Sequence, residues 1–147
     1  MAMRWSSCSV TVPASRASLA FLLLSTAACV TSRTRSFLPS PQNPIYTPAT
    51  AEPVLAEYLR LQCGALRKAQ RPDSGTARFV VDVDTSGFAT RATLVRGTGD
   101  ETLDGVFGTV SAQLTFAKAP RARHEGVDIG YRCEGDDARV AVKAGGQ

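Results

Sequence analysis

Two stretches of the chain repeat their hydrophobic residues at the period of an amphipathic helix. The first covers residues 51–70, and its apolar positions share one helix face: Leu55, Leu59, Cys63 and Leu66. The second begins near Thr98, which together with Glu101 fits a capping box that satisfies free N–H groups at a helix start. Its apolar positions are Leu103, Val106, Phe107, Val110 and Leu114. Each helix is therefore expected to pack one face against a second layer of structure.

Alternating apolar and polar residues predict three strands. Residues 76–84 and 88–96 flank the turn sequence Asp-Thr-Ser-Gly and should form a β-hairpin. A last strand covers residues 127–133, with apolar positions Val127, Ile129, Tyr131 and Cys133. Residues 138–142 offer a further short strand. The order helix, strand, strand, helix, strand predicts an α+β fold with two layers, in which two helices pack a small antiparallel sheet.

Residues 1–28 have the pattern of a secretory signal. An apolar run from Leu19 follows a region whose only charges are Arg4 and Arg16, and small residues precede Cys29. The run is shorter than the roughly 20 apolar residues that span a membrane, and it fits a signal-peptide core. This pattern is typical of bacterial lipoproteins, so we expect cleavage before Cys29 and lipidation of its sulfur, at the periplasmic face of an outer membrane. Ordinary cleavage after the preceding alanines, with Cys29 incidental, is the alternative.

Residues 29–50 read as a proline-rich tether. Four prolines fall close together among Ser, Thr, Gln and Asn: Pro39, Pro41, Pro44 and Pro48. Such a segment buries too little apolar surface to fold by itself, and proline keeps it extended. It would reach roughly 60 Å at most. The folded domain is then expected to cover residues 51–143, with a flexible tail at residues 144–147.

Four cysteines divide between the signal and the domain. Cys8 is lost with the signal and Cys29 carries lipid, which leaves Cys63 and Cys133 as an even pair. In an oxidising compartment such a pair is predicted to form a disulfide. Two free buried thiols are the alternative. A metal site needs more ligands, and His124 is the only histidine, so neither a metal nor a cofactor is expected.

Charge and motifs argue against nucleic-acid binding and against catalysis. The chain has a formal charge of +4, but from residue 51 onward it carries 13 basic and 13 acidic residues. A neutral domain lacks the basic footprint of a nucleic-acid-binding protein. His124 could act as a base, yet no nucleophile motif accompanies it, so we do not expect an enzyme. Residues 82–87 match the start of a calcium loop, but Thr93 stands where the loop requires a bidentate Glu.

Two charged clusters have simpler interpretations than a site. The acidic cluster is Asp100, Glu101 and Asp104, residues that favour the first turn of a helix through its dipole. The basic cluster is Lys118, Arg121 and Arg123, interpreted as a solvated loop. Contact of this loop with lipid headgroups or peptidoglycan is the alternative.

Residues 75–133 resemble the C-terminal domain of the TonB energy transducers. The shared pattern is a strand with an Asp-rich glycine turn, a second strand, a Gly-containing loop before a Leu-Asp helix start, an aromatic exit and a closing strand. In this chain the corresponding segments are residues 79–87, 92–96, 97–104, 114–116 and 125–129. The resemblance implies a TonB-like two-layer fold and binding by a strand edge that pairs with an extended peptide.

The resemblance and the export signal together predict a non-enzymatic, membrane-anchored protein-binding module outside the cytoplasm. Its partner would be an envelope or outer-membrane protein, in transport or energy coupling. The binding edge would be the strand of Val127, Ile129 and Tyr131, unless residues 138–142 cover it. One alternative is a structural lipoprotein that contacts cell wall or another subunit without a peptide ligand. A small hydrolase is the third hypothesis.

Overall fold

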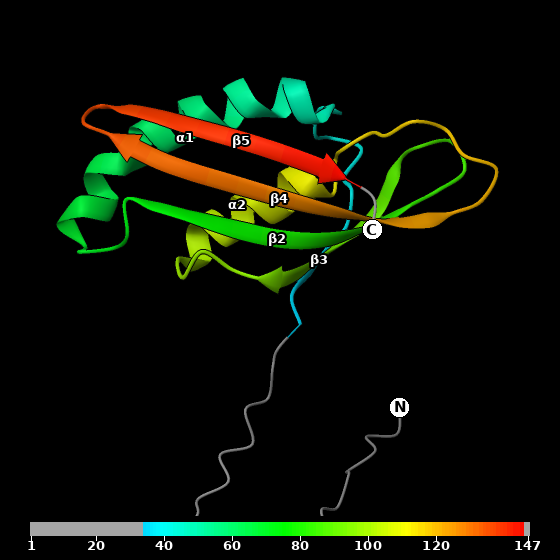
Figure 1. Ribbon diagram of the computed structural model, residues 1–147, viewed down its shortest axis with the longest axis horizontal. Coiled ribbons are helices and arrows are strands. Elements are labelled where there is room, and N and C mark those ends of the chain that lie inside the picture. Colours follow the sequence, from blue (N-terminus) through cyan, green and yellow to red (C-terminus); the bar gives the residue numbers. More distant parts are fainter. Residues whose placement is uncertain (1–33, 146–147) are drawn as a thin grey trace, which may run out of the picture. The chain divides into compact units, whose positions relative to one another are not determined.

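The structure is a computed structural model that describes residues 34–145 (Figure 1). In chain order its elements are β1 (Ser36–Phe37), α1 (Pro48–Lys68), β2 (Ser74–Val83), β3 (Ala89–Arg96), α2 (Glu101–Ser111), β4 (Arg123–Glu134) and β5 (Asp137–Gly145). The predicted signal and Cys29 lie outside the described residues, so lipidation stays a prediction. Within the described range, no helix has the length and apolar character needed to cross a membrane.

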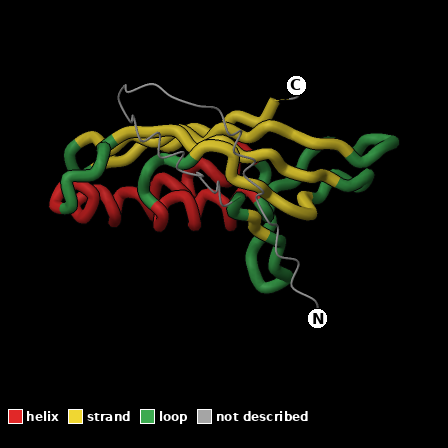
Figure 2. The backbone as a smooth tube through the Cα atoms, turned by 90° about the horizontal axis from the view of Figure 1, so that it is seen from below, coloured by secondary structure: helices red, strands yellow, loops and turns green. Residues whose placement is uncertain are grey.

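The strands form one antiparallel sheet in the order β1-β3-β2-β4-β5. Both helices lie on the same side of this sheet (Figure 2). α1 packs mainly against β5 and β4, whereas α2 packs mainly against β3, β2 and β1. The predicted α+β architecture, a small antiparallel sheet packed by two helices, is therefore confirmed.

The core lies between the sheet and the helices because alternate strand residues point to one face. Its central positions are fully buried: Ala77, Phe79 and Val81 from β2, and Val127 and Ile129 from β4. The strand register places Phe79 opposite Val127 and Ala77 opposite Ile129. α1 contributes the predicted apolar face, which includes Leu55, Leu59 and Leu66. Period-two strands and period-3.6 helices thus meet along one layer, as the sequence pattern predicts.

A disulfide joins Cys63 of α1 to Cys133 of β4, with their Cα atoms 5.7 Å apart. Both cysteines belong to the buried core. The predicted pairing is therefore confirmed, and it links the first helix to a strand 70 residues further along the chain. The bond holds α1 against the half of the sheet formed by β4 and β5.

The predicted capping box at the second helix is wrong. Asp100 is the N-cap of α2, and its side-chain oxygen accepts hydrogen bonds from the N–H groups of Thr102 and Leu103, both at 3.0 Å. Thr98 instead donates its N–H and its hydroxyl to Asp104, at 2.7 and 2.8 Å. Asp104 is buried, and a buried carboxylate needs such donors. Because Asp104 accepts both hydrogen bonds that Thr98 donates, Thr98 does not cap the helix.

The predicted tether is also wrong for residues 34–47, which pack on the domain. Phe37 of β1 stacks edge-on against Phe79, with ring centroids 6.1 Å apart. Gln113 donates its side-chain amide to the carbonyl of Ser40 at 2.7 Å, and its backbone carbonyl accepts from Tyr46 at 3.0 Å. The aromatic side chains supply the apolar surface that a solvated tether lacks. The described fold begins at Thr34, so the chain between it and Cys29 can reach only about 18 Å.

Candidate functional site

The predicted binding edge, formed by Val127, Ile129 and Tyr131, is not a free edge. Their strand β4 is paired with β2 on one side and with β5 on the other. All three side chains are buried in the core, and the Tyr131 hydroxyl donates to the carbonyl of Pro72 at 3.0 Å. Burial raises the pKa of Tyr131 above its ordinary value, with nearby acidic residues adding to the effect. These residues hold the fold together and offer no main-chain groups to a partner.

The expected short strand at residues 138–142 is longer than predicted, and its pairing with β4 is the reason why β4 is not a free edge. β5 covers β4 from Asp137 to Gly145, which includes part of the predicted tail. A tight turn at Gly135, with a φ of 62°, reverses the chain between the two strands. β5 then buries Ala138 and Val142. The unpaired edge on this side of the sheet is therefore the edge of β5.

We use the term β5 edge for the main-chain groups of β5 that point away from β4. Successive residues of a strand direct these groups to opposite sides. Val142 donates its N–H to a side chain of α1 rather than to β4, so it belongs to the outward set. The outward residues are accordingly Ala138, Val140, Val142 and Ala144.

Two carboxylates occupy part of the β5 edge. Glu52, at the start of α1, accepts the N–H of Val142 at 2.8 Å. Asp137 accepts the N–H of Ala138, also at 2.8 Å. Between them, the outward N–H of Val140 has no hydrogen-bond partner among residues 34–145. The amide of Val140 is thus open and lies between two amides that are capped by side chains alone.

Helix α1 runs alongside the β5 edge (Figure 1). Glu57 and Arg60 form an ion pair on this helix at 2.8 Å. The hydrogen bond from Arg60, aided by its charge, lowers the pKa of Glu57. Asp137 contributes to the raised pKa of Arg60, which places that side chain near the start of β5. A strand added to the edge would therefore lie beside charged side chains of α1.

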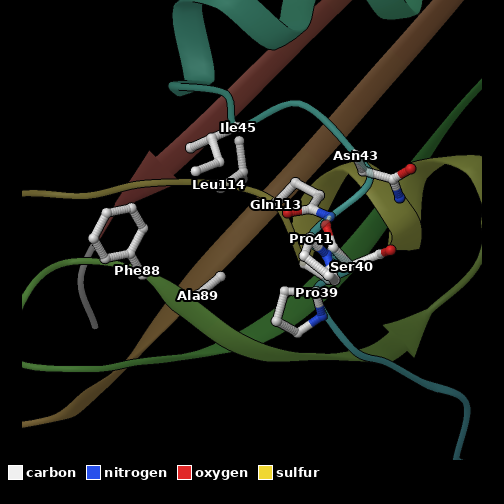
Figure 3. A pocket seen from close by; sticks show the side chains of 10 residues that line it. Pro39, Ser40, Pro41, Asn43, Ile45, Phe88, Ala89, Gln113 and Leu114 are labelled. Atoms are coloured by element: carbon white, nitrogen blue, oxygen red, sulfur yellow. Dashed lines mark hydrogen bonds between the residues drawn. The ribbon is translucent and has the colours of Figure 1, made fainter.

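A small apolar pocket lies near the other side of the fold, between the segment before α1 and the start of β3 (Figure 3). Its volume is about 320 Å³, and Ile45, Phe88 and Leu114 are among its lining residues. Ile45 and Phe88 are exposed, by 60% and 46%. The pocket contains no titratable side chain among its lining residues, so it suits an apolar contact rather than catalysis.

The candidate chemical groups of the sequence are used within the fold. The Nδ1 atom of His124 lies 2.7 Å from a carboxylate oxygen of Asp82. Among the described residues, no hydroxyl or thiol group is hydrogen-bonded to this imidazole. Asp84, from the calcium-like loop, accepts the N–H of Phe88 and so shapes the hairpin turn. Arg123, from the basic cluster, pairs with Glu125. Across residues 34–145, no group of three or more potential metal ligands is assembled.

The β5 edge was missed by the sequence prediction for two reasons. The alternation of Ala138, Val140 and Val142 was visible, but its continuation to residue 145 lacks strong strand formers. The role of Glu52 has no local signal, because it acts on a residue 90 positions away. Comparisons of the chain with protein-family models, with curated proteins and with solved structures found no match. The TonB-like resemblance accordingly remains a prediction.

Proposed function

We propose that the chain is a lipid-anchored protein-binding module outside the cytoplasm. It binds an envelope or outer-membrane protein by pairing the β5 edge with an extended segment of that partner, in a TonB-like manner that serves transport or energy coupling. The observation that carries the proposal is the open N–H of Val140 on a regular edge strand of nine residues. Main-chain pairing at such an edge gives affinity without a chemical step.

The carboxylate caps set how tightly a partner would bind. To pair with Val142, the incoming strand must displace Glu52 from a charge-assisted hydrogen bond. Such bonds contribute about 1.5–3 kcal/mol. The displaced carboxylate returns to solvent near the start of α1, where it is hydrated again. The expected interaction is therefore reversible, and a partner can bind and dissociate without unfolding the sheet.

A proline at position 140 tests this mode of binding. Val140→Pro removes the outward N–H, which the β4–β5 ladder does not use, and proline is tolerated at such a position of an edge strand. The mature, full chain is captured from detergent-solubilised envelopes. We expect wild type and the matched control Val140→Thr to recover the same envelope protein, and Val140→Pro to recover it at least about tenfold less well, a loss of roughly 1.4 kcal/mol.

The fold of the variant is checked by its far-ultraviolet circular dichroism and by the absence of free thiols, since Cys63 and Cys133 should remain paired. Equal recovery by Val140→Pro and Val140→Thr would contradict binding at the β5 edge. Recovery of no envelope protein by the wild-type chain would contradict the binding module itself.

A structural lipoprotein is the second candidate function, and the capped amides favour it. Edge strands that must not pair are commonly protected by charged side chains, and Glu52 and Asp137 occupy two of the outward N–H groups. In that case the chain contacts cell wall or another subunit through side chains. This alternative predicts that Val140→Pro leaves those contacts unchanged.

A further inference from the structure

The sheet face opposite the helices carries an excess of positive charge. Its outward strand positions hold six basic residues: Arg78, Arg91, Arg96, Arg132, Arg139 and Lys143. We call this surface the basic face. It also holds four acidic residues, Asp82, Asp128, Glu134 and Asp137. The chain from residue 51 onward has equal numbers of acidic and basic residues. The neutral domain therefore separates its charges, and this face carries an excess of two positive charges.

Ion pairs within the fold account for only part of the basic face. Arg78 binds Asp128 through two hydrogen bonds of 2.7 Å, and Arg139 lies 3.0 Å from Glu134. The remaining four cations form no salt bridge with the described residues: Arg91, Arg96, Arg132 and Lys143. Arg132 also stands directly opposite Arg139 in the β4–β5 pairing. Like charges in that position oppose pairing, so an external anion would relieve the repulsion.

The basic face is open and has small residues at its centre. A shallow hollow of about 590 Å³ is lined by Gly75, Gly130 and Ala141, with Arg132 and Arg139 among its other lining residues. Both helices lie on the other side of the sheet (Figure 2), so no helix of the described fold covers this face. Anionic groups can therefore approach the arginines without displacing structure.

The N-terminal segment enters the fold at one border of the basic face. Ser36 pairs with Thr93 of β3, and their hydroxyl oxygens lie 3.4 Å apart. β3 is the strand that carries Arg91 and Arg96. Because only about 18 Å of extended chain separates Cys29 from Thr34, a lipid on Cys29 would hold this border close to the membrane surface.

We propose that the basic face lies on the anionic phospholipid surface that holds the lipid anchor, with its unpaired cations against headgroup phosphates. This inference rests on the lipid anchor of the proposed function. Juxtamembrane basic residues are attracted electrostatically to anionic leaflets. β5 and β1 are the two outer strands of the sheet. The β5 edge is therefore far from the β1 border and stays open to a protein partner.

The three lysines of the chain provide an internal test. Lys143 lies on the basic face, whereas Lys68 ends α1 on the helix side. The mature full chain is reconstituted on vesicles of phosphatidylglycerol and phosphatidylethanolamine, or of phosphatidylcholine alone, and labelled with an amine-reactive reagent. On anionic vesicles we expect labelling of Lys143, relative to Lys68, to fall at least about threefold. On phosphatidylcholine, and in 1 M salt, we expect the ratio to recover.

Charge variants separate the face from the rest of the domain. Arg91→Gln together with Arg96→Gln should abolish the protection of Lys143. The matched control, Arg60→Gln together with Arg71→Gln, removes two charges from α1 and the loop that follows it, away from the sheet face, and should leave the protection intact. Equal effects of the two pairs would overturn the proposal.

The remaining outcomes each have one meaning. If the chain floats with both kinds of vesicle but Lys143 is labelled as readily as Lys68 on anionic lipid, the basic face does not bind lipid. Protection of Lys143 that is equally strong on phosphatidylcholine would also overturn the proposal. So would protection that appears only when polyglutamate, a soluble polyanion without lipid, is added. Failure to float with either vesicle would instead contradict the anchor, and Val140→Pro tests the β5 edge independently of all these results.

Discussion

The two edges of the sheet are closed by different means. The β5 edge is a regular strand of nine residues, and side chains cap two of its outward N–H groups, those of Ala138 and Val142. The opposite edge ends in β1, which has only two residues and continues into a segment that contains Pro39 and Pro41. Proline lacks an N–H, so that edge offers a partner few consecutive donors. The β1 edge is therefore short, whereas the β5 edge is long and can be uncovered where a side chain moves away from its N–H group.

The half of the fold formed by α1, β4 and β5 also differs from the half formed by α2, β1, β2 and β3 in what holds its helix in place. α1 is covalently joined to β4 through Cys63 and Cys133. α2 has no such bond and depends on packing, including the contact of Gly108 with the ring of Phe37. The half with the open edge is thus the half with the covalent brace. The predictions below test this difference, beginning with the largest expected effect.

Removal of the disulfide should produce the largest change. In the chain-entropy description, closing a loop of 70 residues stabilises the fold by about 4 kcal/mol. We expect Cys63→Ala together with Cys133→Ala to lower the free energy of unfolding by about this amount, measured by urea denaturation. A loss below about 1 kcal/mol would show that packing of α1 on β5, rather than the bond, braces this half.

The β1 half should lose less, and its loss should depend on Phe37. Phe37 is partly buried, so we expect Phe37→Ala to lower the free energy of unfolding by about 2 kcal/mol. A Cβ atom added at Gly108 would come within 2.2 Å of the Phe37 ring, so Gly108→Ala must displace that side chain and destabilise the fold. With Phe37→Ala already present, the same alanine should stabilise α2 by about 1 kcal/mol. A double-mutant cycle in urea measures this change of sign, and additive effects would contradict the contact.

The contact between Phe37 and Gly108 also shows where sequence prediction fails. The helices, the hairpin and the β4 strand follow from strong periodicity, and the disulfide follows from compartment and cysteine number. β1 has no period to detect, because its two residues sit among prolines and are fixed by contacts with Phe79 and Gly108. The sequence pattern predicted Thr98 as the N-cap of α2, but the buried Asp104 takes both donors of Thr98, and Asp100 is the N-cap instead.

The predicted binding edge falls on β4, a strand that is paired on both sides, and strand-edge binding itself stays a proposal. Strand-edge binding came from the resemblance, while the identity of the edge depended on whether residues after Cys133 form another strand. That question is settled by tertiary packing, since Ala138 and Val142 become buried when β5 lies over α1. No local pattern could reveal that Glu52 reaches this edge.

Glu52 provides the next smaller prediction. Because it accepts the N–H of Val142, we expect that amide to exchange with deuterium more slowly than the neighbouring outward amide of Val140. Glu52→Ala should accelerate exchange at Val142 by about tenfold, which corresponds to roughly 1.4 kcal/mol, as measured by nuclear magnetic resonance. Glu57→Ala is the control, since Glu57 pairs with Arg60 instead. Unchanged exchange at Val142 in Glu52→Ala would mean that the cap does not persist in solution.

The smallest expected effect concerns Asp128, which joins the two halves through Arg78 of β2. The hydrogen bond from Arg78 lowers the pKa of Asp128, burial opposes this, and the charges of Arg96 and Lys143 add to the lowering. A depressed folded-state pKa stabilises the fold above the unfolded-state pKa, and the stabilisation is lost as pH falls through the folded-state value. The Asp128 side chain is 34% exposed, so solvent screening limits the contribution to less than about 1 kcal/mol.

Asp128→Asn should therefore lower the free energy of unfolding slightly at neutral pH, and the difference from wild type should vanish in acid. Urea denaturation between pH 2 and pH 7 checks this, and a constant difference across the range would contradict the ion pair as its cause. The same substitution raises the excess positive charge of the basic face from two to three. It should consequently strengthen protection of Lys143 on anionic vesicles while it weakens the fold, and this opposition separates the membrane contact from stability.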